Sequence, residues 1–293
     1  MIRPALIVHG GCGTPPVGEE AARNAACERA ADAGWAVLSA GGGALEAACA
    51  AVRQLEDEPL LNAGTGAYLQ ADGVARLDAS VMTGDGRAGA VVQVPGLANP
   101  IELARYLLQH DAHVMLSGRE ALELALRLGH AAKVVATPAK ISYWQTHLDE
   151  ACTQLDYAAM AGQWKADNPR RLGTVGCVAL DGAGQLAAAT STGGTGQCYP
   201  GRVGDTPILG AGTYATPQVA VSMTGVGERI MVLLSAKRLC DLVADGRTPT
   251  QAAAVVLAEL DRVKGAAGLI ALAADGTMVE ERNTPYMASA RRR

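Results

Sequence analysis

The sequence has no phenylalanine, and aromatic residues make up only 3% of its 293 positions. A core must therefore be filled by Ala, Val, Leu, Ile and Met, which favours closely packed layers of small side chains. Apolar residues still account for 49% of the chain and charged residues for 18%, which permits a large buried core and excludes global disorder. The length fits one large domain or two ordinary ones.

Other absences narrow the class of protein. The basic residues are scattered and the net charge is −4, so no basic stripe for nucleic acid is visible. The run Arg291 to Arg293 is expected to be a solvated tail. No apolar run approaches the ~20 residues of a membrane helix, and the run within 1–10 is too short for a signal peptide. The seven cysteines form no C-x-x-C pair, which argues against a disulfide framework or a zinc site and fits a reducing cytoplasm.

Two kinds of apolar run alternate along the chain. Short β-branched runs predict strands, and longer runs with helical spacing predict helices. The expected strands cover 5–8, 76–82, 88–94, 174–180, 185–191, 218–224 and 267–272. The expected helices cover 18–40, 43–56, 100–109, 119–129, 227–243 and 249–263. Hairpin signals lie at 83–86 and 181–184. Because strands come in hairpins and helices in pairs, we expect packed sheets with helices outside.

Residues 156–172 do not follow this alternation. They are polar, contain a proline and lack strand or strong helix periodicity. An ordinary surface loop is one interpretation. The segment also leads directly into Gly173-Thr174 at the start of an expected strand, which is the arrangement that a mobile connector to an internal cleavage site requires.

Thr174 is a candidate nucleophile. A threonine hydroxyl needs a base to take its proton, and cleavage before Thr174 would free an α-amine for that role. The pKa of such an amine, about 7.7–8.0, lies close to working pH. No Ser/His/Asp arrangement competes: four histidines lie in helical or loop stretches, and only His9 lies in a Gly-rich turn. Gly173 gives the backbone freedom that attack on the preceding carbonyl requires.

Downstream, hydroxyl and charged residues recur at Gly-rich strand ends, in 189–194, 200–207 and 224–228. Arg202 and Asp205 are three residues apart. Together they could hold a zwitterion, with arginine on an α-carboxylate and aspartate on an α-ammonium. A surface ion pair is the alternative interpretation.

The motifs carry a family resemblance. They are His9-Gly10-Gly11, Asn62-Ala63-Gly64-Thr65-Gly66-Ala67, Leu77-Asp78-Ala79-Ser80-Val81-Met82, Gly173-Thr174-Val175-Gly176, Thr190-Ser191-Thr192-Gly193-Gly194, Gly201-Arg202-Val203-Gly204-Asp205, Gly210-Ala211-Gly212-Thr213-Tyr214-Ala215 and Thr224-Gly225-Val226-Gly227-Glu228. Because these motifs occur in this order, the chain resembles the plant-type L-asparaginase and isoaspartyl (β-aspartyl) peptidase family of N-terminal-nucleophile hydrolases. The resemblance covers nearly the whole chain and implies an α+β fold, a four-layer αββα sandwich.

The resemblance also implies roles for individual residues. Thr174 would be the nucleophile, freed by self-cleavage after Gly173 into 1–173 and 174–293, with 156–172 as the mobile linker. Thr192 would help to activate it, and Thr224 with the Gly225 amide would form an oxyanion hole. The implied substrate-binding residues are Arg202, Val203, Gly204, Asp205, Gly227 and Asn62.

The implied reaction is hydrolysis of L-asparagine and β-aspartyl dipeptides to L-aspartate, without a catalytic metal. The loop 55–61 resembles one that binds a structural Na⁺ (or K⁺) through backbone carbonyls, here those of Leu55, Glu56, Glu58 and Leu61. A homodimer of αβ units in the cytoplasm is implied, with small-molecule substrates and neither nucleic acid nor membrane as partner. Glycosylasparaginase activity, a threonine protease of the same fold and a non-catalytic binding protein are the alternatives. Thr195-Gly196 stands where many relatives have Met-Thr, which leaves the preferred leaving group open.

Overall fold

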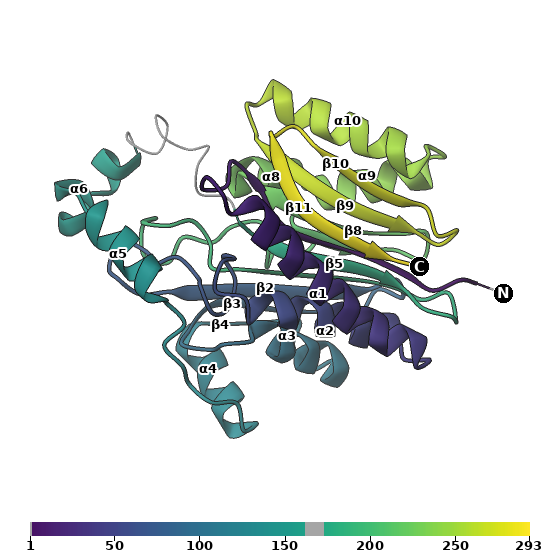
Figure 1. The fold of residues 1–293 in the computed structure, drawn as a ribbon, viewed down its shortest axis with the longest axis horizontal. Helices are drawn as coiled ribbons and strands as arrows, with labels where there is room; N and C mark the ends of the chain where they lie inside the picture. The colour runs from purple at the N-terminus through teal and green to yellow at the C-terminus, as the bar shows by residue number, and fades with distance from the viewer. Residues whose placement is uncertain (1, 162–172) are drawn as a thin grey trace.

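The structure is a computed structural model that describes residues 2–161 and 173–293. Two β-sheets lie face to face at its centre (Figure 1). One sheet has the order β11 (Tyr286–Arg292), β1 (Ala5–Gly13), β5 (Val175–Leu180), β6 (Leu186–Thr192), β2 (Arg76–Thr83), β3 (Ala88–Pro95), β4 (Met115–Ser117). The other has the order β10 (Met278–Arg282), β9 (Ala267–Ala273), β8 (Val219–Gly225), β7 (Thr213–Ala215). Paired strands are antiparallel except β3 and β4, which are parallel.

Helices cover the outer face of each sheet (Figure 1). The seven-stranded sheet is covered by α1 (Glu20–Ser39), α2 (Ala44–Glu56) and α3 (Pro100–His110). The four-stranded sheet is covered by α9 (Ser235–Ala244) and α10 (Pro249–Arg262), with α8 (Gly227–Leu233) beside them. Helix α4 (Gly118–Arg127) packs against β3 of the seven-stranded sheet, and α5 (Pro138–Thr146) and α6 (Glu150–Gln154) lie towards one end of the molecule (Figure 1). This layering is the αββα sandwich that the sequence predicts.

The core has three main parts, one between each pair of layers. Every residue of β1, β5, β6 and β9 is buried, because a sheet inside this sandwich is covered on both faces. Small residues let the layers approach closely where aromatic residues are missing. At Gly34 of α1 a Cβ atom would lie 2.9 Å from the carbonyl oxygen of Ala47 in α2, so a larger residue would separate the two helices.

Both predicted hairpins are confirmed. Gly86 has φ +91° in the turn between β2 and β3. In the turn between β5 and β6, Asp181 Oδ1 accepts hydrogen bonds from the backbone N–H groups of Ala183 and Gln185, both at 2.9 Å. Asp181 Oδ2 also accepts from Ala44 N at 3.0 Å, so this turn caps the first turn of α2 and fixes that helix against the sheet.

Two predictions about the C-terminal part were wrong. The helix expected over 227–243 is two helices, because Leu234 adopts a left-handed conformation with φ +46° between α8 and α9. The expected tail at Arg291 to Arg293 belongs largely to β11, which pairs with β1 at the sheet edge. Arg292 Nη2 lies 2.7 Å from carboxylate oxygens of Glu28 and Asp32 on α1, which hold it to the protein.

The segment 156–172 was expected to lack helical structure, and its first part does not fit that expectation. Residues 157–161 are helical, and Asp156 Oδ1 accepts hydrogen bonds from Ala158 N and Ala159 N as an N-terminal cap. The side chain of Met160 is buried. The rest of the predicted linker, 162–172, lies outside the described residues. None of the described helices is long and apolar enough to cross a membrane.

Candidate active site

Thr174 lies immediately before β5, an inner strand of the seven-stranded sheet, and its side chain is buried. Its Oγ1 donates a hydrogen bond to Thr192 Oγ1, the last residue of the neighbouring strand β6, at 3.1 Å. Gly194 N donates to the same Thr192 oxygen, also at 3.1 Å. Because Thr192 Oγ1 accepts both bonds, its position is fixed beside the candidate nucleophile, as the sequence predicts.

Thr224 and Gly225 end strand β8 in the facing sheet. Thr224 Oγ1 is buried and has no hydrogen-bond partner within 2–161 and 173–293. Thr224 does not itself line the cavity, but its neighbour Gly225 does; since buried hydroxyl groups are nearly always paired, the unpaired Thr224 group suggests a ligand partner. Gly225 has φ +150°, and a Cβ there would lie 2.7 Å from Ala267 Cα, so only glycine fits this lining position.

Arg202 and Asp205 line the same cavity as Thr174 and Thr192. They do not pair with each other: the guanidinium of Arg202 contacts Glu228 through Nε and Nη2, both at 2.8 Å. Asp205 Oδ2 is buried without a hydrogen-bond partner in the described ranges. The surface ion pair is therefore wrong: Arg202, whose side chain is 15% exposed, and the buried Asp205 carboxylate both line one cavity.

The electrostatics of this pair follow from burial. Desolvation raises the pKa of Asp205 to about 7, and the nearby Arg202 guanidinium limits that rise. Burial alone would lower the pKa of Arg202, but the Glu228 carboxylate keeps it above its ordinary value. The cavity thus holds a permanent cation next to a carboxyl group that titrates near neutral pH.

The other four residues predicted to bind substrate differ in where they lie relative to the cavity. Gly204 lines the cavity, and Gly227 is packed so closely that a Cβ would lie 2.8 Å from Arg202 Nη2 and from Asp205 Oδ1. Val203 is half-buried and is not among the lining residues. Asn62 is close to the cavity without lining it: its Nδ2 donates to Gly194 O at 2.6 Å.

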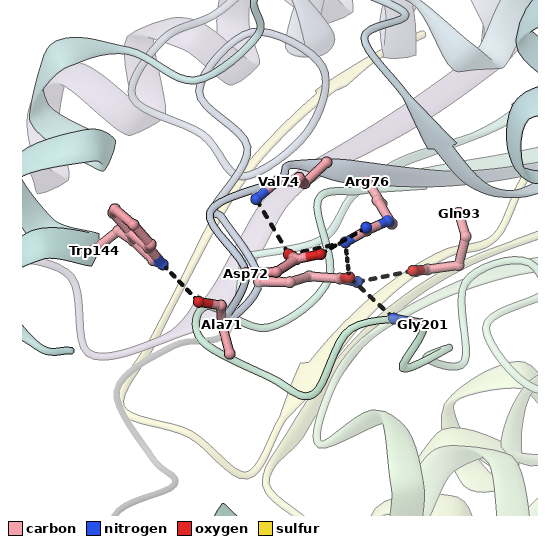
Figure 2. A network of polar contacts seen from close by, with 8 residues as sticks. Ala71, Asp72, Val74, Arg76, Gln93, Trp144 and Gly201 are labelled. Atoms are coloured by element: carbon pink, nitrogen blue, oxygen red, sulfur yellow. Dashed lines mark hydrogen bonds and ion pairs between the residues drawn. The ribbon is translucent and has the colours of Figure 1, made fainter. Parts of the chain in front are cut away.

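A polar network that the sequence analysis missed holds the segment carrying Arg202 (Figure 2). Gln70 Oε1 accepts hydrogen bonds from Gly201 N at 3.1 Å and from Arg76 Nη1 at 2.6 Å. Gln70 Nε2 donates to Gln93 Oε1 at 2.8 Å, and Gln93 Nε2 donates to the carbonyl oxygen of Arg202 at 2.9 Å. The backbone on both sides of the Gly201-Arg202 bond is therefore fixed by two glutamine side chains, one from the loop before β2 and one from β3.

Asp78 supports this network from β2. Its Oδ1 accepts a hydrogen bond from Gln93 N at 2.7 Å, and Gln93 adopts a left-handed conformation with φ +55°. Burial raises the pKa of Asp78 to about 6, and the Gln93 backbone hydrogen bond opposes the rise. The motif 77–82 had been noted without a role. A carboxyl group at a position expected to be buried within a strand is the signal that could have indicated one.

His9 is fully buried on β1, next to the strand that begins after Thr174. Its Nε2 lies 2.9 Å from Ser222 Oγ on the facing sheet. Desolvation lowers the pKa of His9 to about 3, although a hydrogen bond to the Thr174 backbone partly opposes this. Such an imidazole stays neutral at working pH and is a weak base, which supports a base other than histidine for this site.

The contact between His9 and Ser222 starts a row of buried hydroxyl groups between the two sheets. Ser222 Oγ lies 2.8 Å from Thr190 Oγ1, Thr213 Oγ1 donates to Thr190 Oγ1 at 2.6 Å, and Ser80 Oγ donates to Thr213 Oγ1 at 2.7 Å. Ser80 Oγ also lies 2.5 Å from the carbonyl oxygen of Thr206, and its single proton serves one of these two acceptors at a time. The row connects the back of the nucleophile strand to the residue that follows Asp205.

The loop predicted to hold a cation lies near Asn62, and its four residues do not line the cavity. The Glu56 side chain is buried: its Oε1 accepts from Ser191 Oγ at 2.6 Å and from Ile101 N at 3.1 Å. Burial raises the pKa of Glu56 well above its ordinary value. The carbonyl oxygens of Pro59 and Leu61 pack against Gly66, since both lie within 2.7 Å of the point where Gly66 would carry a Cβ.

An αββα sandwich with a buried threonine at the start of an inner strand, bonded to a second threonine and facing an Arg/Asp pair, defines the class of N-terminal-nucleophile hydrolases. Comparison with known proteins gives the family. The asparaginase family model matches residues 2–293. The chain belongs to the asparaginase family.

Curated relatives agree with this assignment. An isoaspartyl peptidase/L-asparaginase of Rattus norvegicus is 40% identical over 281 residues, covering 94% of this chain and 81% of the relative. A plant-type L-asparaginase of Pyrococcus horikoshii is 38% identical, covering 98% and 95% of the two chains. An isoaspartyl peptidase of Escherichia coli is 37% identical, covering 98% and 92%.

Proposed function

We propose that this protein hydrolyses the β-amide bond of L-asparagine and of β-aspartyl dipeptides and releases L-aspartate. Membership of the asparaginase family and the names of its relatives support this activity. The observation that carries the proposal is the single cavity in which Thr174 and Thr192 meet Arg202 and Asp205. A hydroxyl nucleophile and the two charges that recognise an α-amino acid are thereby within reach of one small molecule.

The aspartyl end of the substrate is held as a zwitterion. The guanidinium of Arg202 binds the α-carboxylate, and Asp205 Oδ2 accepts the α-ammonium. Gly227 leaves room for both, because any side chain there would collide with the pair. This grip selects substrates with a free α-amine and a free α-carboxylate, and it directs the β-carbonyl towards Thr174.

Acyl transfer then follows from the hydroxyl groups. The α-amine of Thr174 takes the Oγ1 proton as Oγ1 bonds to the β-carbonyl carbon, and Thr192 orients Oγ1 for the attack. The oxyanion receives hydrogen bonds from Thr224 Oγ1 and Gly225 N; one such donor contributes about 10²–10³ in rate. The amine passes the proton to the departing nitrogen. Water then attacks the aspartyl ester, and the amine assists in the same way.

The free amine requires a cut before Thr174, and we propose that the chain makes this cut itself. Thr174 Oγ1 attacks the carbonyl carbon of Gly173, the C–N bond between the two residues breaks, and water hydrolyses the resulting ester. Gly11 lies against this bond with φ +95°, and a Cβ on Gly11 would lie 2.7 Å from Gly173 Cα. The products would be 1–173 and 174–293, and we propose that two such αβ units form a homodimer.

A structural monovalent cation is part of the proposal. Hard cations take oxygen ligands such as backbone carbonyls, and the predicted ligands are the carbonyl groups of Leu55, Glu56, Glu58 and Leu61. Of these, Glu56 O accepts a hydrogen bond from Thr65 N at 2.7 Å and Glu58 O accepts from Leu61 N at 3.1 Å, which shapes the loop. Bound there, the cation would fix the loop leading to Asn62 and take no part in the chemistry.

Gel electrophoresis and kinetics on two variants test the proposal. Purified protein should give two fragments, one that ends at Gly173 and one that starts at Thr174. It should also hydrolyse β-Asp-Leu and L-asparagine. Thr174→Ala should stay one chain and lose turnover by at least about 10³-fold. The matched surface variant Thr146→Ala should behave like the unaltered protein. Substantial turnover by Thr174→Ala would refute the mechanism.

A further inference from the structure

Strands β2 and β3 lose their regular register at Asp78. Between the residue pairs that flank this point, β2 supplies Asp78 alone, whereas β3 supplies both Val92 and Gln93. The extra residue makes a β-bulge, a feature that redirects a side chain and is common beside active sites. The side chain redirected here is that of Gln93, which contacts the segment carrying Arg202.

The bulge holds Gln93 in an unfavourable backbone conformation. Its φ is +55°, in the left-handed region that glycine and asparagine adopt far more readily than glutamine. Asp78 Oδ1 keeps the bulge in place by accepting the hydrogen bond from Gln93 N at 2.7 Å. Strained residues persist where the surrounding structure forces them, and they cluster at functional sites. The side chain of Gln93 is therefore expected to have a role that outweighs the strain.

The donors around Gln70 determine how the two glutamine amides are oriented. Gln70 Oε1 accepts hydrogen bonds from Arg76 Nη1 and Gly201 N, and neither of these groups can act as an acceptor (Figure 2). The Nε2 group of Gln70 therefore faces Gln93 Oε1. This contact in turn directs Gln93 Nε2 to the carbonyl oxygen of Arg202, at 2.9 Å. Gln70 thus sets the direction in which Gln93 donates.

The segment that receives this hydrogen bond is irregular, and the guanidinium it carries has little room. Residues 199–204 form neither helix nor strand, and a Cβ at Gly201 would meet no described atom within 4 Å. At the other end of the Arg202 side chain, a Cβ on Gly204 would lie 2.7 Å from Nη1. A Cβ on Gly227 would lie 2.8 Å from Nη2. The guanidinium therefore occupies a narrow slot, and its fit there depends on where the backbone of Arg202 is held.

We propose that Gln93 is a positioning residue of the substrate site: its side chain, oriented by Gln70, fixes the carbonyl group of Arg202 and so holds the guanidinium ready for the substrate α-carboxylate. This role rests on the proposed function and extends it to a residue that does not line the catalytic cavity. An arginine that is fixed before binding loses less conformational freedom when the substrate arrives, which strengthens binding. The α-carboxylate contact is the same in the ground state and the transition state, so Gln93 acts on KM rather than on kcat.

Gln93→Gly removes the side chain and relieves the backbone strain at the same time. Because glycine accepts a φ of +55° freely, the variant should still fold and cleave itself. KM for β-Asp-Leu and KM for L-asparagine should both rise about fivefold, as expected for the loss of one hydrogen bond, and kcat should stay within about twofold of the unaltered enzyme. The inhibition constant of L-aspartate, which measures binding of the aspartyl group directly, should rise by the same factor.

Two further variants separate the reach of the side chain from the backbone effect. Asparagine also tolerates a left-handed backbone, but its amide is one methylene group shorter, so Gln93→Asn should raise KM as Gln93→Gly does. Asp111→Gly is the matched control, because the exposed Asp111 ends α3 with a φ of +48° and glycine relieves a similar strain there. Its KM values and its inhibition constant for L-aspartate should equal those of the unaltered enzyme.

The outcomes are distinguishable. An unchanged KM in Gln93→Gly or in Gln93→Asn overturns the positioning role and leaves the proposed function standing. A fall in kcat that matches the rise in KM also counts against it, because a contact made equally in both states leaves kcat unchanged. If neither variant folds, Gln93 is a structural residue and the positioning role is likewise overturned. Failure of the unaltered, fully cleaved enzyme to turn over either substrate overturns the proposed function, and the positioning role with it.

Discussion

The acid limb of the pH profile should be governed by two groups, of which only one affects kcat. Asp205 must be ionised to accept the substrate ammonium, and burial raises its pKa to about 7 in the unliganded protein. The α-amine of Thr174 must be neutral to act as a base, and its unperturbed pKa is about 7.7–8.0. Once substrate is bound, the ammonium keeps Asp205 ionised, so Asp205 affects KM and the amine affects kcat.

The expected change in KM follows from these pKa values. At pH 6 a carboxyl group with a pKa of about 7 is ionised in about one molecule in ten. KM for β-Asp-Leu should therefore rise about tenfold between pH 8 and pH 6. Over the same range log(kcat/KM) should approach a slope of two against pH, whereas log kcat should approach a slope of one. Initial rates at constant ionic strength between pH 5 and pH 9 measure both.

A variant of Glu228 tests whether the pKa of Asp205 sets the pH dependence of KM. The negative charge of Glu228 contributes to the raised pKa of Asp205, so Glu228→Gln should move the midpoint of the KM limb to lower pH. It should also raise KM at every pH, because Arg202 loses its partner at 2.8 Å. Glu259→Gln removes a comparable surface pair with Arg238 and should leave the midpoint in place. A KM that stays constant from pH 8 to pH 6, or a midpoint that moves upward in Glu228→Gln, refutes the reasoning.

Two further predictions concern stability and are measured by urea unfolding of the uncleaved Thr174→Ala protein. Burial raises the pKa of Glu56 in the fold well above its ordinary value of 4.5, so unfolding releases its proton and its contribution to stability falls as the pH rises above that value. Glu56→Gln lacks this loss, so the free energy of unfolding of that variant minus that of the protein with Glu56 should increase from pH 5 to pH 7. A difference that stays constant with pH would contradict this. Gly176→Ala should cost about 3 kcal/mol or more, because its Cβ would collide with Ser222 Oγ and lie 2.6 Å from His9 Nε2. A loss below about 1 kcal/mol would show that the two side chains can move aside.

Much of the fold could be predicted because its signals are local. Asp181 and Gly86 occupy turns whose residue types fit them, and the strands of the sandwich are continuous apolar runs. The break at Leu234 has no such signal, since a leucine with φ +46° is unfavourable by itself and is accepted only through tertiary contacts. Likewise Arg292 becomes part of a strand because α1 offers Glu28 and Asp32, which are distant in sequence.

The residues of the candidate site likewise include some that the sequence could predict and others that it could not. Thr174, Thr192, Arg202 and Asp205 could be named because their motifs are compact, and the structure brings them into one cavity. The supporting residues could not be named, because their roles depend on pairing across the fold. Gln70 acts on Gly201 over 131 positions, and no pattern in either segment indicates the contact.

The strand order of the seven-stranded sheet has a consequence for the protein once it is cut. Segments before and after the cut are interleaved: β1 lies between β11 and β5, and β6 lies next to β2. Cleavage after Gly173 therefore cannot release either fragment without breaking hydrogen-bonded ladders on several strands. The uncut chain folds as one molecule, whereas a cut and unfolded protein must bring two molecules together to refold. Folding should thus precede cutting, and the rate of recovery from denaturation should depend on protein concentration only after the cut.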